Sequence, residues 1–108
     1  MMIKICFFVP PSHIDVVKQA MFDAGAGKIG DYDSCCWQTL GTGQFKPLLG
    51  SQPFIGEAGG EVEFVEEYKV EMVCEREKLQ AAINALRKAH PYEEPAFDVI
   101  ALLDPAGL

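Results

Sequence analysis

The segment His90-Pro91-Tyr92-Glu93-Glu94-Pro95 separates the last helical pattern of the chain from its last strand pattern. Each of its two prolines fixes φ and lacks a backbone N–H group, so neither a helix nor a strand can continue through it. An imidazole, a phenol and two carboxylates are therefore held on a short, rigid connection. We call residues 90–95 the hinge and expect it to carry the chemistry of a functional site.

Regular patterns flank the hinge on both sides. Before it, apolar residues recur with helical period from Leu79 to Ala89, and Arg87 and Lys88 lie in the last turn, where cations complement the helix dipole. After it, alternating residues from Phe97 to Leu103 predict a strand that ends at Asp104-Pro105. The hinge thus joins a helix to a strand.

The N-terminal part of the chain has the same two kinds of element. Alternation from Ile3 to Val9 predicts a strand. A helix is predicted over about residues 12 to 24. Ser12 would be its N-cap, Asp15 occupies the capping-box position, and Gly25 would supply the left-handed residue that closes it.

Two more strands and a long connection lie in the middle of the chain. Residues 34–40 predict a second strand that contains Trp37, and residues 61–74 predict a long third strand with an apolar row on one face and glutamates on the other. Residues 41–60 contain six glycines and two prolines, and predict an excursion that packs through Phe45, Phe54 and Ile55.

The resulting order, β-α-β-β-α-β, predicts an α+β, ferredoxin-like fold in which both helices cover one face of an antiparallel four-stranded sheet. A chain of 108 residues with 49% hydrophobic content can form one core, so we expect a single domain over residues 1–108. Trp37 and an apolar row of the third strand cannot both lie under two helices. An exposed patch of this kind predicts an oligomer.

Composition argues against several partners. The formal charge of −7, without any cluster of Lys and Arg, opposes nucleic-acid binding. The apolar run 3–9 is too short to cross a membrane and has no basic leader, so we expect a cytoplasmic protein without a membrane partner. The four cysteines lack a C-x-x-C spacing and predict reduced, mostly buried thiols: Cys6, Cys35, Cys36 and Cys74.

Five motifs follow one another along the chain: Gly27-x-x-Gly30-x-Tyr32-x-x-Cys35, Gly41-Thr42-Gly43-x-Phe45-x-Pro47, Pro53-x-Ile55-Gly56-x-x-Gly59, Glu63-x-Val65-Glu66-x-x-x-x-Glu71, and the hinge with Ala96-x-Asp98. In this order they resemble the domain inserted in bacterial YqfO proteins of the Nif-three-like (NGG-one interacting factor) family, a module similar to CutA and PII proteins. The resemblance implies a ferredoxin-like subunit that forms trimers. The metal-binding halves that flank the insert in those relatives have no counterpart here, so neither their dinuclear metal chemistry nor their GTP-cyclohydrolase label attaches to any residue of this chain.

Two classes of function remain open. The first is a non-enzymatic, trimeric binding or regulatory module that holds a small molecule or protein partner in clefts between subunits, with the excursion as its mobile element. Its candidate ligand-binding residues are His90, Tyr92, Glu93, Glu94, Glu57, Gly41, Gly43 and Phe45. The second is a small enzyme in which His90 acts as acid or base and Glu93 or Glu94 orients it.

Metal binding of the CutA-like kind is a further hypothesis. His90 and Glu94 would supply nitrogen and oxygen ligands, which suit a divalent ion such as zinc, with the hinge near Glu57 of a neighbour's excursion. The structural alternative is that His90 ends the helix, hydrogen-bonds a carbonyl and holds the hinge in place, and that Tyr92 is a packing residue. The sequence leaves these alternatives open and names no cofactor.

Overall fold

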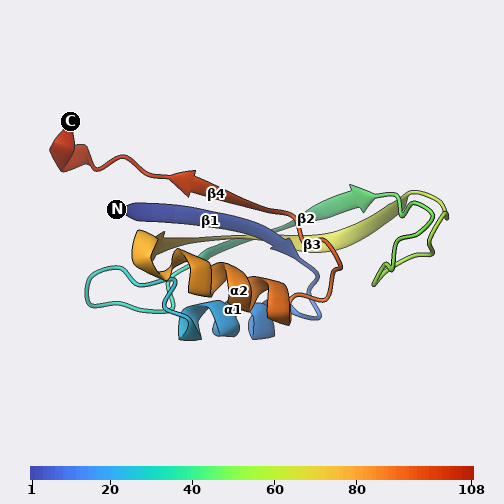
Figure 1. Cartoon of the computed structure of the whole chain (residues 1–108), viewed down its shortest axis with the longest axis horizontal. Coiled ribbons are helices and arrows are strands. Elements are labelled where there is room, and N and C mark those ends of the chain that lie inside the picture. The colour runs from blue at the N-terminus through green and yellow to red at the C-terminus, as the bar shows by residue number, and fades with distance from the viewer.

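The computed structural model describes all 108 residues and contains four strands and two α-helices (Figure 1). In chain order these are β1 (Met2–Val9), α1 (Ile14–Asp23), β2 (Trp37–Phe45), β3 (Glu63–Glu75), α2 (Leu79–Ala89) and β4 (Phe97–Ala101), with 3-10 turns at Arg76–Lys78 and Pro105–Gly107. The sheet order is β2-β3-β1-β4, and every neighbouring pair is antiparallel. This is the predicted ferredoxin-like α+β fold.

Both helices lie on one face of the sheet (Figure 1), and the core forms between them and that face. Alternation along each strand sends every second side chain toward the helices. The largest fully buried side chains come from the two helices and the two central strands, β1 and β3: Phe7, Ile5, Met21, Leu86, Val9, Val17, Val70 and Cys74. The opposite face, which we call the outer face, carries Lys4, Cys6 and Phe8 of β1 and Glu67, Lys69 and Glu71 of β3.

The apolar row of β3 is better covered than its length suggests. Val70, Met72 and Cys74 are buried under the helices whereas Trp37 is exposed, so the expectation that this row and Trp37 cannot both lie under the helices is confirmed. The uncovered part is the end of β3 that extends beyond β1, because within β3 only residues 68–75 pair with β1. Phe64 in that extension and Trp37 at the start of β2 are each 68% exposed.

The start of α1 differs from the prediction. The helix begins at Ile14, and its N-cap residue is His13, which makes no side-chain capping bond. Ser12 lies in a turn that the His13 N–H group closes by donating to the Pro10 carbonyl, and its Oγ contacts His13 Nδ1 at 2.8 Å. Ser12 is therefore not the N-cap. The left-handed closing residue is confirmed, since Gly25 has φ +106°.

Strand β2 is longer at its C-terminal end than predicted and starts three residues later. It begins at Trp37 and continues through the glycines to Phe45, which shortens the excursion to residues 46–62. Gly41 pairs with Glu67 and Phe45 with Glu63. These ladder hydrogen bonds outweigh the low strand propensity of glycine, which a local sequence pattern cannot reveal.

The β2–β3 hairpin extends beyond the rest of the sheet, and the excursion at its tip folds back toward the body of the molecule (Figure 1). The hinge between α2 and β4 lies on this same side (Figure 1). Neither helix has both the length and the apolar character needed to cross a membrane. The fold thus brings the hinge, the end of β2 and the excursion, which are far apart in sequence, to one region.

Candidate ligand-binding cavity

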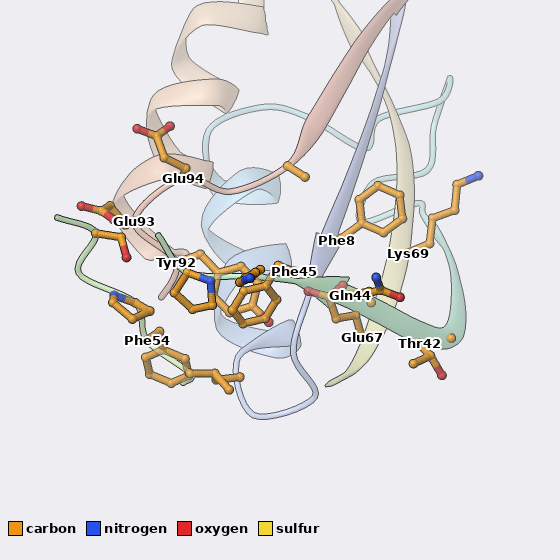
Figure 2. A pocket seen from close by; sticks show the side chains of 18 of the residues that line it. Phe8, Thr42, Gln44, Phe45, Phe54, Glu67, Lys69, Tyr92, Glu93 and Glu94 are labelled. Atoms are coloured by element: carbon orange, nitrogen blue, oxygen red, sulfur yellow. The ribbon is translucent and has the colours of Figure 1, made fainter. Parts of the chain in front are cut away.

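A cavity of about 890 Å³ opens where β2, the excursion and the hinge meet (Figure 2). This volume is in the range of small-molecule sites. Six of the eight predicted ligand-binding residues line it: Gly41, Gly43, Phe45, Tyr92, Glu93 and Glu94. The remaining two, Glu57 and His90, do not line it. Glu57 is exposed, and its backbone carbonyl accepts a bond from the Gly60 N–H group at 2.8 Å.

His90 lies behind the cavity as a buried corner residue. It is the C-cap of α2, is 6% exposed, and has the extended ψ of 137° that a residue before proline adopts. Its Nε2 lies 2.6 Å from the Phe8 carbonyl, and its Nδ1 lies 3.1 Å from the Tyr92 backbone nitrogen. The ring therefore ties the hinge to the end of β1.

These two partners fix the tautomer of His90. A carbonyl can only accept a hydrogen bond, so Nε2 carries the proton and donates to Phe8, whereas Nδ1 accepts from the Tyr92 N–H group. Burial lowers the pKa of His90 below its usual value, although the Phe8 hydrogen bond and the Glu67 charge act to raise it. The ring is neutral, and both of its nitrogens are engaged within the subunit.

This arrangement bears on the catalytic and metal hypotheses. Neither Glu93 nor Glu94 hydrogen-bonds His90, so the predicted orienting carboxylate does not contact the ring. A metal ion at His90 would have to displace one of its two hydrogen bonds. Within one subunit no group of three or more His, Cys, Asp and Glu side chains converges on a metal position.

Tyr92 carries a buried hydroxyl whose neighbouring acceptor is the Glu67 carboxylate, although the two groups lie outside ideal hydrogen-bond geometry. Burial, and after it the neighbouring Glu67 carboxylate, raise the pKa of the Tyr92 phenol well above its usual value. The phenol is therefore neutral at every physiological pH. Because buried polar groups in native proteins are paired, the Tyr92 O–H group is suited to hold the Glu67 carboxylate in place at the cavity wall.

Glu67 was not among the predicted site residues, yet it lines the cavity. Its side chain lies across β2 at Gly43, where a Cβ atom would meet the Glu67 carboxylate. Gly43 thus leaves the room that this carboxylate occupies. The sequence did carry a signal for it, because a glycine inside a strand often marks a close approach by another group.

Aromatic rings form one wall of the cavity. The Tyr92 ring lies 6.3 Å from the Phe45 ring and 6.2 Å from the Phe54 ring, measured between centroids, and both pairs are tilted. Phe54 also packs edge-on against His13, 5.4 Å away, which anchors the excursion to the start of α1. Figure 2 shows these three cavity rings gathered together, with Glu67 beyond Phe45.

The two hinge glutamates have different surroundings. The Glu93 carboxylate accepts a hydrogen bond from the Gln52 backbone N–H group at 3.0 Å, whereas Glu94 is exposed and lies apart from the rings (Figure 2). Within one chain the hinge therefore contacts the excursion at Gln52, whereas the approach of the hinge to Glu57 of a neighbouring subunit stays a prediction. Glu93 holds the excursion over the cavity.

Comparison with known proteins identifies relatives of this sequence. No protein-family model matches the chain. It is 47% identical over 104 residues to a "GTP cyclohydrolase 1 type 2 homolog" of Mycobacterium leprae, which covers 96% of this chain and 27% of that protein. The crystal structure of a Bacillus cereus protein related to NIF3 superposes with a TM-score of 0.79 at 39% identity, covering 95% of this chain and 26% of that one. This chain is a relative of one segment of the NIF3-related proteins.

The predicted resemblance to the NIF3-related family is thereby confirmed for that segment. The chain spans about a quarter of the length of these relatives. The PII-like protein CutA from Nostoc has a TM-score of 0.66 over all of this chain and 86% of its own, at 19% identity. This second likeness shows a common fold, in agreement with the predicted CutA- and PII-like architecture.

Proposed function

We propose that the chain is a non-enzymatic, trimeric binding or regulatory module that holds a small molecule in the cavity between β2, the excursion and the hinge, at a cleft that a neighbouring subunit completes. The cavity is the observation that carries this proposal, because its wall combines three aromatic rings, one of them a phenol, with a carboxylate. Ligand sites are commonly apolar hollows with a few convergent polar groups. The engagement of both His90 nitrogens favours binding over acid–base catalysis.

The two edge strands support assembly. Strands β2 and β4 each have one unpaired edge and carry exposed apolar side chains, including Trp37, Leu40, Val99 and Ile100. Such edges pair readily with another chain. A contact between β2 of one subunit and β4 of the next would join different surfaces, and contacts of that kind close into rings. The trimer also follows from the resemblance to CutA and PII proteins.

The cellular setting belongs to the same proposal. All four cysteines are free, which suits the reducing cytoplasm. Besides a small molecule, a NIF3-like protein that lacks this segment is a candidate partner. The matched segment is 27% of the M. leprae relative, and the proposal assigns no cyclohydrolase step to this chain.

Native mass spectrometry of the protein purified from its own host tests the proposal. We expect a mass of three chains together with one or more retained small molecules, released when the protein is denatured. The same sample should scatter light as a trimer at micromolar concentration. A monomer mass in both measurements would overturn the trimer, and a trimer from which no small molecule is released and to which no metabolite extract binds would overturn the ligand-binding role.

A further inference from the structure

We propose that the cavity selects an organic cation, a ligand that bears an amine or quaternary ammonium group, and that this group lies between the aromatic wall and the Glu67 carboxylate. The inference rests on the proposed binding function and names the chemical class of its ligand. It depends on the aromatic rings and on the charges that line the cavity.

The aromatic wall supplies the first element. Tyr92 lies between Phe45 and Phe54, and its ring is tilted by 49° and 45° to theirs. Tilted rings do not stack flat on one another, so these lining rings do not fully cover one another's faces. Such faces attract cations within about 6 Å, and groups of two or three aromatic rings are a recurrent way to hold ammonium groups.

Glu67 supplies the negative charge. It is half-buried, and it takes part in neither of the two ion pairs of the chain, which join Lys4 to Glu71 and Lys18 to Asp15. A partly desolvated carboxylate without a counter-ion favours a cationic ligand, because the ligand restores the lost electrostatic stabilisation. The neighbouring Tyr92 hydroxyl lies beside this carboxylate and can hold it in place by donating its O–H group.

The remaining charges argue against a phosphate-bearing ligand. Four carboxylates and two amines line the cavity: Glu67, Glu71, Glu93 and Glu94, and Lys46 and Lys69. Figure 2 shows the Lys69 amine pointing away from the rings. The hinge follows the C-terminal end of α2, which bears the negative end of the helix dipole, and neither α-helix begins among the lining residues. Anion sites use the opposite arrangement.

A pair of isosteric probes tests the charge requirement. Choline and 3,3-dimethyl-1-butanol have the same shape but differ by one positive charge, and n-butylammonium with n-butanol adds a primary amine. We would titrate each into the assembled, full-length protein and follow backbone amide signals by NMR. We expect at least one cation to shift Gly43, Phe45 and Tyr92 signals with at least about tenfold higher affinity than its neutral partner.

Matched variants locate the charge. Glu67→Gln should lower the affinity for the cation by about tenfold and leave binding of the neutral isostere unchanged. Glu66→Gln removes the same charge from the preceding residue and serves as the control. Glu66 is exposed, lies outside the cavity and points to the other face of β3, so cation binding should not change. Gly43→Ala should displace Glu67 and weaken cation binding, because its added Cβ would meet the Glu67 carboxylate.

The outcomes separate this inference from the binding function itself. Equal binding of cation and isostere, or a retained host molecule without a positive group, would overturn the cation proposal and leave the binding module standing. Equal losses of cation affinity in Glu67→Gln and Glu66→Gln would also overturn the cation proposal, because they would indicate a general effect of net charge. Absence of shifts with both cations at tens of millimolar would overturn it as well, whatever the host ligand.

Discussion

His90 is the one buried polar residue of the chain, and its neutral state holds two segments together. Protonation at Nδ1 would replace the bond from the Tyr92 N–H group with two facing donors. The folded protein therefore resists taking up this proton, which agrees with the lowered pKa of His90. Protonation of the His90 ring would therefore destabilise the hinge, because its hydrogen bond with Tyr92 would be lost.

We predict that this histidine makes stability depend on pH. Because the folded pKa lies below the ordinary value of 6.5, the unfolded chain binds the proton first as the pH falls. The contribution of neutral His90 to the free energy of unfolding is complete above about pH 6.5 and is lost as the pH falls below it. Urea unfolding of the wild type at pH 7.5 and 5.5 should show a lower free energy of unfolding at pH 5.5.

The His90→Gln variant isolates the effect. It should be less stable at both pH values but should lose less stability between them than the wild type. His13→Gln removes the other histidine and serves as the control, since the half-buried His13 contacts Ser12 and Phe54, and its charge has the smallest effect among the groups that act on the pKa of His90. Parallel pH profiles for His90→Gln and the wild type would contradict the prediction.

Zinc binding is a separate test at this residue. Because both ring nitrogens are engaged, we expect the chelator-treated wild type and His90→Ala to bind zinc with equal affinity in calorimetry at neutral pH. Surface glutamates can bind zinc weakly in both proteins, so only the difference between them counts. A clear loss in His90→Ala, together with a loss in Glu94→Gln, would instead support the metal site predicted from the sequence.

At the scale of elements, the excursion is fastened at three places. Pro47 is buried near its start, Phe54 packs against His13, and the Gln52 N–H group donates to Glu93. The last of these links it to the hinge. The hinge in turn is fixed to β1 by His90. The position of the excursion therefore depends on the hinge, where Glu93 lies 41 residues after Gln52.

We predict that Glu93→Ala loosens the excursion without unfolding the protein. The amide of Gln52 should exchange its hydrogen faster, by about fivefold, because a hydrogen bond at the surface is worth roughly 1 kcal/mol. Glu94→Ala is the matched control, since it removes the adjacent carboxylate, which has no hydrogen-bond partner. Hydrogen-exchange mass spectrometry would measure both, and equal exchange at Gln52 in the two variants would refute the predicted role of Glu93.

At the scale of the whole molecule, the outer face of the sheet and its two edge strands remain uncovered in one subunit. Trp37, the single tryptophan, is 68% exposed, and its indole N–H group donates to Thr39 at 3.0 Å. Exposed apolar residues on β4 lie at the opposite edge of the same sheet. Edge pairing between copies would bring these two surfaces together and remove both from water.

Trp37 should therefore report assembly. In the assembled protein we expect blue-shifted emission and weak quenching, and on dilution both should move toward the values of an exposed indole. Quenching should be measured with neutral acrylamide as well as iodide, because the charge of −7 repels an anion. Free quenching by acrylamide in a sample that light scattering shows to be oligomeric would place Trp37 outside the interface.

Much of the architecture follows from the sequence alone. The alternating and helical periods predicted the element order, and the prolines of the hinge predicted the break between α2 and β4, because these signals depend only on neighbours along the chain. Six residues that line the cavity were also predicted, since their motifs combine glycine, aromatic and acidic residues outside regular patterns. The start of α1 and the length of β2 were wrong where a local turn or a distant ladder partner decided the outcome.

Only the tertiary structure decided how the site residues are used. His90 turns inward because the Phe8 carbonyl, 82 residues away in sequence, accepts a hydrogen bond from its Nε2. A pattern of neighbouring residues cannot reveal a contact between such distant segments. Glu67 became part of the cavity because pairing between β2 and β3 sets it beside Gly43, in the space that a missing side chain leaves free. Periodicity shows which face a residue occupies, whereas the contact across that face depends on how distant segments pack.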